Sequence, residues 1–250
     1  MSRAGPTAAP EVAPWIDRWT RRGLAAPTAN ALAAAAAVRQ VRRGATLVVP
    51  GERDKAILVL DGYLAVRVID ADGHQLILTL ARRGQTLVPP IAPPPLISEV
   101  EIVAISAAVA AIVPAQLVWD LAKQDRGFAL RLLDLSRGVV ERLLSRLEAL
   151  TFSTARERLA VVLLAYEPLF ASSTPIVQRR VLAGLVGVSR EMTGRLLLGL
   201  ERDGLIRRAG SEIAILDPDR LRAVADWEEA GRGHYAEVRG PDGDDPLLDP

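Results

Sequence analysis

The stretch LAGLVGVSREMTGRLLLGLERDG, residues 182–204, has the start and stop signals of two short helices joined by a tight turn. Gly187 suits that turn, because glycine adopts backbone conformations that are closed to other residues. Ser189 offers a hydroxyl that can cap the second helix, and Asp203-Gly204 is typical of a helix end. We therefore predict a helix-turn-helix whose second helix lies between Ser189 and Asp203.

The second helix is expected to have two unlike faces. On a wheel of about 100° per residue, one side carries Arg190, Glu191, Gly194 and Arg195, and the other carries Met192, Thr193, Leu196 and Leu200. Arginine can donate to both acceptors of guanine, and glutamate can accept from the cytosine amino group. Glycine keeps the helix surface low and allows close approach. We predict that Arg190, Glu191 and Arg195 read bases of double-stranded DNA.

Contacts to the DNA backbone are expected from the flanking residues. Arg179 and Arg180, on the preceding helix, are placed to meet phosphates and to set the register; Ser189, Thr193 and Arg208 are further candidates. The segment LIRRAGSEIAIL (205–216) is typical of two short strands, a wing. From Gln178 to Arg208 there are seven arginines and three acids, which favours an anionic partner. The alternative is an ordinary solvated helix face.

Upstream, residues 117–152 have a helical pattern with an apolar heptad seam. The seam comprises Ala129, Leu133, Ser136, Val140, Leu143, Leu147 and Leu150. Such a helix can cover its own domain or pair with its twin in a homodimer. Leu132, Leu135 and Val139 form a second stripe, so both uses can coexist. We predict dimerisation through Leu133, Val140, Leu143, Leu147 and Leu150.

The first half of the chain has a sequence pattern typical of β-strands. Residues 15–38 have helix-forming composition, broken at Pro27, and short β-branched runs then extend from Val41 to Val113. Asp61-Gly62 and the segment Asp70–Gly73 are strong turn signals. Many short strands at such spacing predict a sandwich or barrel.

The composition excludes several classes of protein. The 250 residues are 50% hydrophobic with a net charge of +1, and they include no cysteine, which rules out disulfides, thiolate nucleophiles and Cys-ligated metal. His74 and His234 lie in a turn and near the end, and no P-loop or dinucleotide fingerprint is present. We predict neither an enzyme nor a bound cofactor. The longest apolar run, 102–115, is too short to span a membrane, so a cytoplasmic protein is expected.

The segment VGVSREMTGRLLLGLERDGLI (186–206) closely resembles the winged helix-turn-helix of the Crp/Fnr family of bacterial transcription regulators. Their signature SRE-x-x-GR stands here as Ser189-Arg190-Glu191 and Gly194-Arg195. The resemblance extends over nearly the whole chain. It implies an α+β fold: an antiparallel β-barrel of jelly-roll type, like a cyclic-nucleotide-binding domain, then a long dimerisation helix and the DNA module. It also implies a palindromic site with TGTGA-like halves. Leu198 departs from relatives that carry a lysine there.

This resemblance divides the chain into five parts. We expect a leader at 1–14, a cyclic-nucleotide-binding-like β-barrel at 15–116 and a dimerisation helix at 117–152. A winged helix-turn-helix would follow at 153–230, and an acidic disordered tail at 231–250.

The ligand pocket departs from the nucleotide-binding relatives. The resemblance places their Gly-Glu pair on Val88-Pro89 and their Arg-Ser or Arg-Thr pair on Ser98-Glu99, so each polar group is missing. The intervening stretch LVPPIAPPPL (87–96) carries five prolines, which lack amide donors. Glu99 would also repel a phosphate. We predict a degenerate pocket and an effector other than cyclic AMP.

Alternatives for the control of the protein stay open at this point. Cyclic di-GMP could bind through Arg82-Arg83 or Arg42-Arg43, or the protein could be always competent for DNA or controlled by a partner protein. RNA polymerase is a further candidate partner. The leading hypothesis is a homodimeric, sequence-specific DNA-binding regulator. The alternative is a sensor or protein-interaction module whose helix-turn-helix serves as a docking surface.

Overall fold

The computed structural model describes residues 11–21, 23–49, 51–69, 74–88, 100–171 and 174–225. The chain divides into two compact units. Of the described residues, one unit comprises those up to Ala65 together with Leu80–Val139, and the other comprises Val66–Thr79 and those from Val140 to Ala225. Most of the expected leader, the expected tail and the predicted Asp70–Gly73 turn lie outside the described residues.

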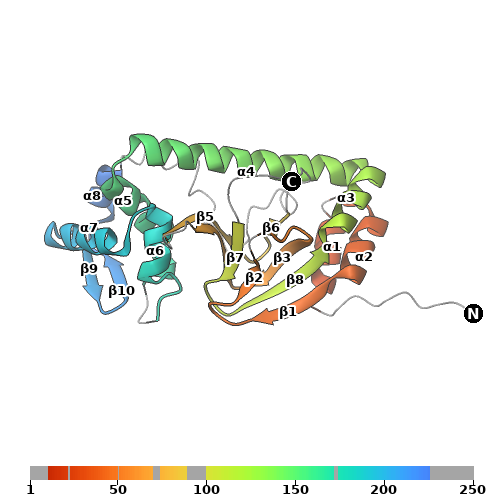
Figure 1. The fold of residues 1–250 in the computed structure, drawn as a ribbon, viewed down its shortest axis with the longest axis horizontal. Coiled ribbons are helices and arrows are strands. Elements are labelled where there is room, and N and C mark those ends of the chain that lie inside the picture. Colours follow the sequence, from red (N-terminus) through yellow and green to blue (C-terminus); the bar gives the residue numbers. More distant parts are fainter. Residues whose placement is uncertain are drawn as a thin grey trace, which may run out of the picture. The chain divides into compact units, whose positions relative to one another are not determined.

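Two four-stranded antiparallel sheets form the β-structure of the first half, in the orders β1-β8-β3-β6 and β2-β7-β4-β5 (Figure 1). The strands are β1 (Ala37–Val41), β2 (Thr46–Val48), β3 (Lys55–Asp61), β4 (Tyr63–Ile69), β5 (Gln75–Arg82), β6 (Thr86–Leu87), β7 (Val100–Ala104) and β8 (Ala108–Pro114). The predicted antiparallel β-domain is confirmed, as two open sheets rather than a closed barrel of the described strands. The predicted Asp61-Gly62 turn joins β3 to β4. Gly62 is required there, because its φ is +77° and a Cβ would lie 2.2 Å from the Ala107 carbonyl oxygen.

Helices α1 (Ala13–Arg21) and α2 (Ala26–Ala35) pack against the sheet that contains β3 and β8 (Figure 1). Val12, Trp15 and Leu32 are buried in these contacts. The predicted leader, residues 1–14, therefore extends too far, because α1 begins at Ala13 and Val12 is already buried. Pro27 lies in the first turn of α2, where its missing N–H costs nothing. The first strand also begins at Ala37, four residues earlier than expected.

The predicted helix over 117–152 is two helices, α3 (Ala115–Gln124) and α4 (Arg126–Phe152). Asp125 separates them. Its extended backbone ends α3, and its carboxylate accepts a hydrogen bond from the Phe128 N–H at 3.1 Å, which caps α4. The same carboxylate accepts from the Thr28 hydroxyl at 2.7 Å. These bonds hold the pKa of Asp125 below its ordinary value, the Thr28 bond most strongly.

The C-terminal elements match the predicted winged helix-turn-helix in order and in type. They are α5 (Ala155–Ala165), a 3-10 turn at Glu167–Leu169, α6 (Arg179–Val186), α7 (Arg190–Arg202), β9 (Ile206–Ala209), β10 (Glu212–Ile215) and α8 (Pro218–Ala225). Thr154 and Glu157 form a capping box at the start of α5. Asp217 caps α8, as predicted, by accepting from the Arg220 N–H at 2.9 Å. In the described part of the chain, no helix is long and apolar enough to cross a membrane.

Candidate nucleic-acid interface

Two buried arginines hold the carboxyl end of α6, the first helix of the turn. Arg146 of α4 donates to the Gly184 carbonyl at 3.2 Å, and Arg158 of α5 donates through Nε to the Val186 carbonyl at 2.9 Å. Their exposed fractions are 2% and 9%. The last carbonyls of a helix lack partners within it and carry partial negative charge, so guanidinium groups satisfy both demands. Arg158 also donates to the Ser153 carbonyl at 2.6 Å, which ties the end of α4 to α5 and α6.

Gly187 makes the tight turn, as predicted. It ends α6 in the left-handed conformation, with φ of +74°, and its N–H donates to the Ala183 carbonyl at 2.9 Å. A Cβ at this position would lie 2.9 Å from Cδ2 of Leu150. Glycine is therefore needed twice, for the backbone conformation and for the close approach of Leu150.

Helix α7 begins at the predicted cap. The Ser189 hydroxyl oxygen accepts a hydrogen bond from the Met192 N–H at 3.1 Å. The buried face of α7 consists of Thr193, Leu197 and Leu200. Met192, which we expected on that face, is 37% exposed. The buried stripe is thus rotated by part of a turn from the predicted one, and the opposite side is left to solvent.

That exposed side carries the three predicted base-reading residues. Arg190, Glu191 and Arg195 are all exposed, and Glu191 lies 3.3 Å from Arg195 in an ion pair one turn apart. An exposed pair of this kind contributes little to stability, so it can open at small cost. A side chain at Gly194 would meet nothing within 4 Å. The surface there is low and open, as expected.

The position of the Thr193 side chain contradicts the predicted contact of Thr193 with the DNA backbone. Its side chain is 1% exposed, and its hydroxyl donates to the Ser189 carbonyl at 2.9 Å. It cannot reach a phosphate from this position, because it belongs to the packed face of α7. A threonine within a helix commonly donates a hydrogen bond to the carbonyl four residues before it. The sequence could therefore have indicated that the Thr193 hydroxyl is used within the helix.

The Arg208 side chain is also hydrogen-bonded within the protein. Its backbone N–H donates to Glu201 Oε1 at 3.0 Å, and its guanidinium donates twice to Glu201 Oε2, at 2.8 and 2.5 Å. The Arg208 side-chain bond, followed by the backbone bond, holds the pKa of Glu201 below its ordinary value of 4.5. This ion pair joins β9 of the wing to the end of α7. It gives Arg208 a structural role, and the phosphate contact of Arg208 stays a prediction.

The neighbouring arginine, Arg207, points the other way. Adjacent residues of a strand face opposite sides, so the bond of Arg208 to Glu201 leaves Arg207 exposed. Arg202, in the last turn of α7, is exposed as well. Neither residue was assigned a role from the sequence, although the strand alternation gave a signal for Arg207. Arg179 and Arg180, at the start of α6, are exposed as predicted.

The predicted seam of α4 is exposed over most of its length. Leu133, Val140, Leu143 and Leu147 are 64%, 55%, 42% and 60% exposed, whereas Leu150 is half-buried beside Gly187. Of the second stripe, Leu132 and Leu135 are buried, whereas Val139 is 41% exposed. The helix therefore covers its own domain with one stripe and leaves the other free.

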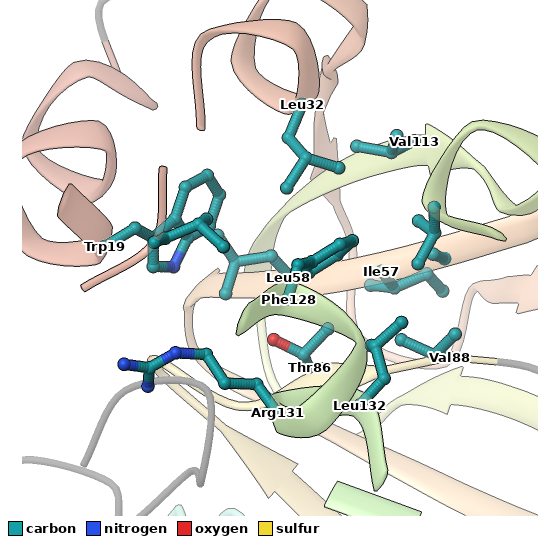
Figure 2. A pocket seen from close by; sticks show the side chains of 13 residues that line it. Trp19, Leu32, Ile57, Leu58, Thr86, Val88, Val113, Phe128, Arg131 and Leu132 are labelled. Carbon is teal, nitrogen blue, oxygen red and sulfur yellow. The ribbon is translucent and has the colours of Figure 1, made fainter. Parts of the chain in front are cut away.

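A small apolar cavity of about 50 Å³ lies in the β-domain (Figure 2). Leu32, Leu58, Val113, Phe128 and Leu132 are among its lining residues, and so is Val88, the described member of the predicted degenerate pocket. In Figure 2 Arg131 extends to one side of the cavity. Ligand sites for drug-sized molecules usually enclose about 300 Å³ or more, so a nucleotide does not fit here. Pro89, Ser98 and Glu99 lie outside the described residues, among which no acidic, histidine or cysteine cluster could hold a metal ion.

Comparison with known proteins agrees with this architecture. Residues 157–224, from α5 to α8, match the family of Crp-like helix-turn-helix domains. The transcriptional regulator SdrP of Thermus thermophilus is 28% identical over 202 residues, which cover 74% of this chain and 90% of SdrP.

Two solved structures share the fold. A transcriptional regulator of the Crp/Fnr family from Eubacterium rectale has a TM-score of 0.72 at 18% identity, covering 82% of this chain and 97% of that one. The c-di-GMP responsive global regulator CLP of Xanthomonas campestris has a TM-score of 0.63 at 23% identity, covering 76% and 96%.

The C-terminal elements therefore form a Crp-like helix-turn-helix DNA-binding domain. Over 74% of its length the chain is similar to the transcriptional regulator SdrP, and it shares the fold of a Crp/Fnr family regulator. SdrP is described as a transcriptional regulator, and the structures from Eubacterium rectale and Xanthomonas campestris are described as regulators as well.

The Glu201–Arg208 pair predicts a pH-dependent contribution to stability. A carboxylate whose pKa is lowered on folding stabilises the protein above its unfolded pKa, and this stabilisation is lost as pH falls through the folded pKa. Glu201→Gln should therefore lower the Tm at pH 7, and its difference from wild type should shrink once the pH falls below the ordinary value of 4.5. Thermal unfolding followed by circular dichroism from pH 7 to about 3 measures this.

The matched control is the same substitution in an Arg208→Met background. There the Glu201→Gln step should change the Tm little at any pH, because the partner is already gone. A Tm difference that stays constant from pH 7 into the acid range, with Arg208 present, would contradict the role of the ion pair.

Proposed function

We propose that this chain acts as a homodimeric, sequence-specific regulator that reads a palindromic DNA site with α7 in the major groove. The observation that carries the proposal is the exposed face of α7. Arg190, Glu191 and Arg195 leave it on the side opposite Thr193, Leu197 and Leu200, which fix the helix to its domain. Guanidinium and carboxylate groups at these positions match the acceptors of guanine and the donor of cytosine. A TGTGA-like half-site is the sequence that the family resemblance suggests.

Arginines on neighbouring elements are suited to the phosphates that border the groove. Arg179 stands at the first position of α6, and Arg207 is exposed on the wing. Contacts of this kind set the position of a protein on the duplex without reading its sequence. Arg180 and Ser189 are exposed as well, which supports their predicted place beside the backbone.

The exposed seam of α4 supports the homodimer. Leu133, Val140, Leu143 and Leu147 would otherwise leave a row of large apolar side chains in water. Pairing with the same seam of a second chain removes them from solvent with heptad packing. A two-fold dimer would present two copies of α7 to half-sites about 34 Å apart, one helical turn of DNA.

The division of the chain follows from these roles. We assign the residues from α1, which begins at Ala13, to residue 116 to the β-domain, 117–152 to the dimerisation segment and 153–230 to the DNA-binding domain. A regulator that acts on a bacterial chromosome works in the cytoplasm, where that DNA lies.

We also propose that cyclic AMP is not the effector. Val88, where nucleotide-binding relatives have a glycine, lines an apolar cavity, and Leu143 and Leu144 are apolar where such relatives present hydroxyls to adenine. The fold shared with CLP, which its description calls c-di-GMP responsive, makes cyclic di-GMP the second ligand to test. A DNA affinity that rises on addition of cyclic AMP would show this proposal to be wrong.

Substitutions on α7 and α6 should separate base reading from backbone contact. Arg190→Ala is expected to weaken binding to the best duplex by about 1–3 kcal/mol and to relax the preference at one base pair of each half-site. Arg179→Ala should instead weaken binding to all sequences by a similar factor. Fluorescence anisotropy with the selected duplex and all single-base variants of one half-site measures both.

Arg222→Ala is the control, since Arg222 lies on α8 in an ion pair with Asp219 at 2.5 Å, outside the α6, α7 and wing surface. It should leave binding unchanged. If Arg190→Ala and Arg179→Ala lose affinity uniformly over all duplexes, the assignment of base reading to Arg190 is wrong.

The seam of α4 should be sensitive to charge. Leu143→Glu combined with Leu147→Glu is expected to convert the dimer to monomer at about 10 µM chain, because like charges would face each other across a heptad interface. Analytical ultracentrifugation measures the mass.

Leu130→Glu is the matched control. Leu130 is 52% exposed on the same helix but lies outside the predicted seam, so the variant should remain dimeric. Dimers of unchanged strength in the double variant would place the interface elsewhere.

A further inference from the structure

The surface formed by α6, α7 and the wing keeps surplus positive charge after its ion pairs are counted. The three acids of the 178–208 segment are each paired with an arginine: Glu191 with Arg195, Glu201 with Arg208 and Asp203 with Arg156. The side chains of four exposed arginines of this segment make no hydrogen bond or ion pair to another described residue: Arg179, Arg190, Arg202 and Arg207. We call these four residues the arginine face. Its charge is not balanced by the surrounding domain.

Balancing charge is present in the chain itself, directly after the DNA-binding domain. Residues 226–250 contain eight acids and two arginines, Arg232 and Arg239, for a net charge of −6. The acids are Asp226, Glu228, Glu229, Glu237, Asp242, Asp244, Asp245 and Asp249. The family match ends at residue 224, so this acidic segment lies outside the part of the chain that the match covers.

The acidic segment is attached close to the arginine face. Its attachment point is the end of α8, where Leu221 and Ala225 are buried in the DNA-binding unit. The cluster Asp242–Asp249 begins 17 residues after Ala225, a length of chain that can span up to about 55 Å. A domain of this size has a radius of gyration of about 12 Å, so these acids can reach any part of its surface. Tethering of this kind gives an effective concentration in the millimolar range.

We propose that the acidic segment 226–250 binds the arginine face and competes with DNA for it. Carboxylates accept the same bidentate hydrogen bonds from guanidinium groups that phosphates accept. The contact is electrostatic and weakens with salt, because charges are screened over about 10 Å at 0.1 M. DNA must displace the segment before the arginines meet phosphates. The segment therefore lowers the affinity for every duplex, most strongly at low salt. The competition rests on the proposed function, since it takes the arginine face as the surface that meets DNA.

The first test neutralises the segment within the full-length protein, by changing its four aspartates at 242, 244, 245 and 249 to Asn and its other four acids to the corresponding amides. The neutral protein should bind both a palindromic and an unrelated duplex about tenfold more tightly at 50 mM salt, and less than about twofold more tightly at 400 mM. Fluorescence anisotropy gives these affinities. Equal affinities of the two proteins at 50 mM salt would overturn the proposal.

The second test needs no DNA, so it separates this proposal from the proposed function. A dye-labelled peptide of residues 226–250 should bind the neutral full-length protein, and Arg179→Gln with Arg207→Gln should weaken that binding at least threefold. Arg222→Gln, outside the arginine face, should not weaken it. A peptide of the same composition in scrambled order should bind equally well, because the contact follows charge. No binding of the peptide, or no effect of the two arginine substitutions, would overturn the proposal even if the protein binds DNA.

Discussion

The arrangement of the DNA-binding domain depends on two buried guanidinium groups. Arg146 and Arg158 come from different helices and donate to carbonyls at the end of the same helix, α6. A buried charge without partners is costly, and so is a helix end without partners, so each satisfies the other. The turn at Gly187 begins where these bonds are made, and α7 begins three residues later. The direction of α7 is thus set by hydrogen bonds at the end of the preceding helix, α6.

The same stretch of α4 serves two surfaces. Arg146 lies between Leu143 and Leu147, yet it is buried whereas they are exposed. Arg146 follows Leu143 by three residues, so it lies at the edge of the face that carries the leucines, where its guanidinium reaches the carboxyl end of α6. In the proposed dimer, one turn of helix would therefore contact the second chain and hold α6. Such an arrangement couples the spacing of the two recognition helices to the pairing of the seams.

Local signals in the sequence predicted much of this architecture, and tertiary pairing accounts for what they missed. Ser189, Gly187 and Asp217 were assigned correctly because caps and turns involve residues only a few positions apart. The buried position of Thr193 was missed because it depends on which face of α7 is packed. The bond between Arg208 and Glu201 was missed because it depends on how the wing folds back. The break at Asp125 was missed for a similar reason. An aspartate inside a helical pattern is ambiguous until Thr28 is known to lie beside it.

That link between Thr28 and Asp125 also bears on the order of folding. The two residues are 97 positions apart in the chain, and their hydrogen bond joins the second helix to the junction of α3 and α4. Closing so long a loop costs conformational entropy before its contacts stabilise the chain. Contacts between residues so far apart in the sequence therefore form late in folding. The start of α4 is thus held twice: locally by the bond from the Phe128 N–H to Asp125, and across the chain by the bond from Thr28 to the same carboxylate. The local bond can form as soon as α4 does, whereas the Thr28 bond fixes that helix start to the N-terminal helices.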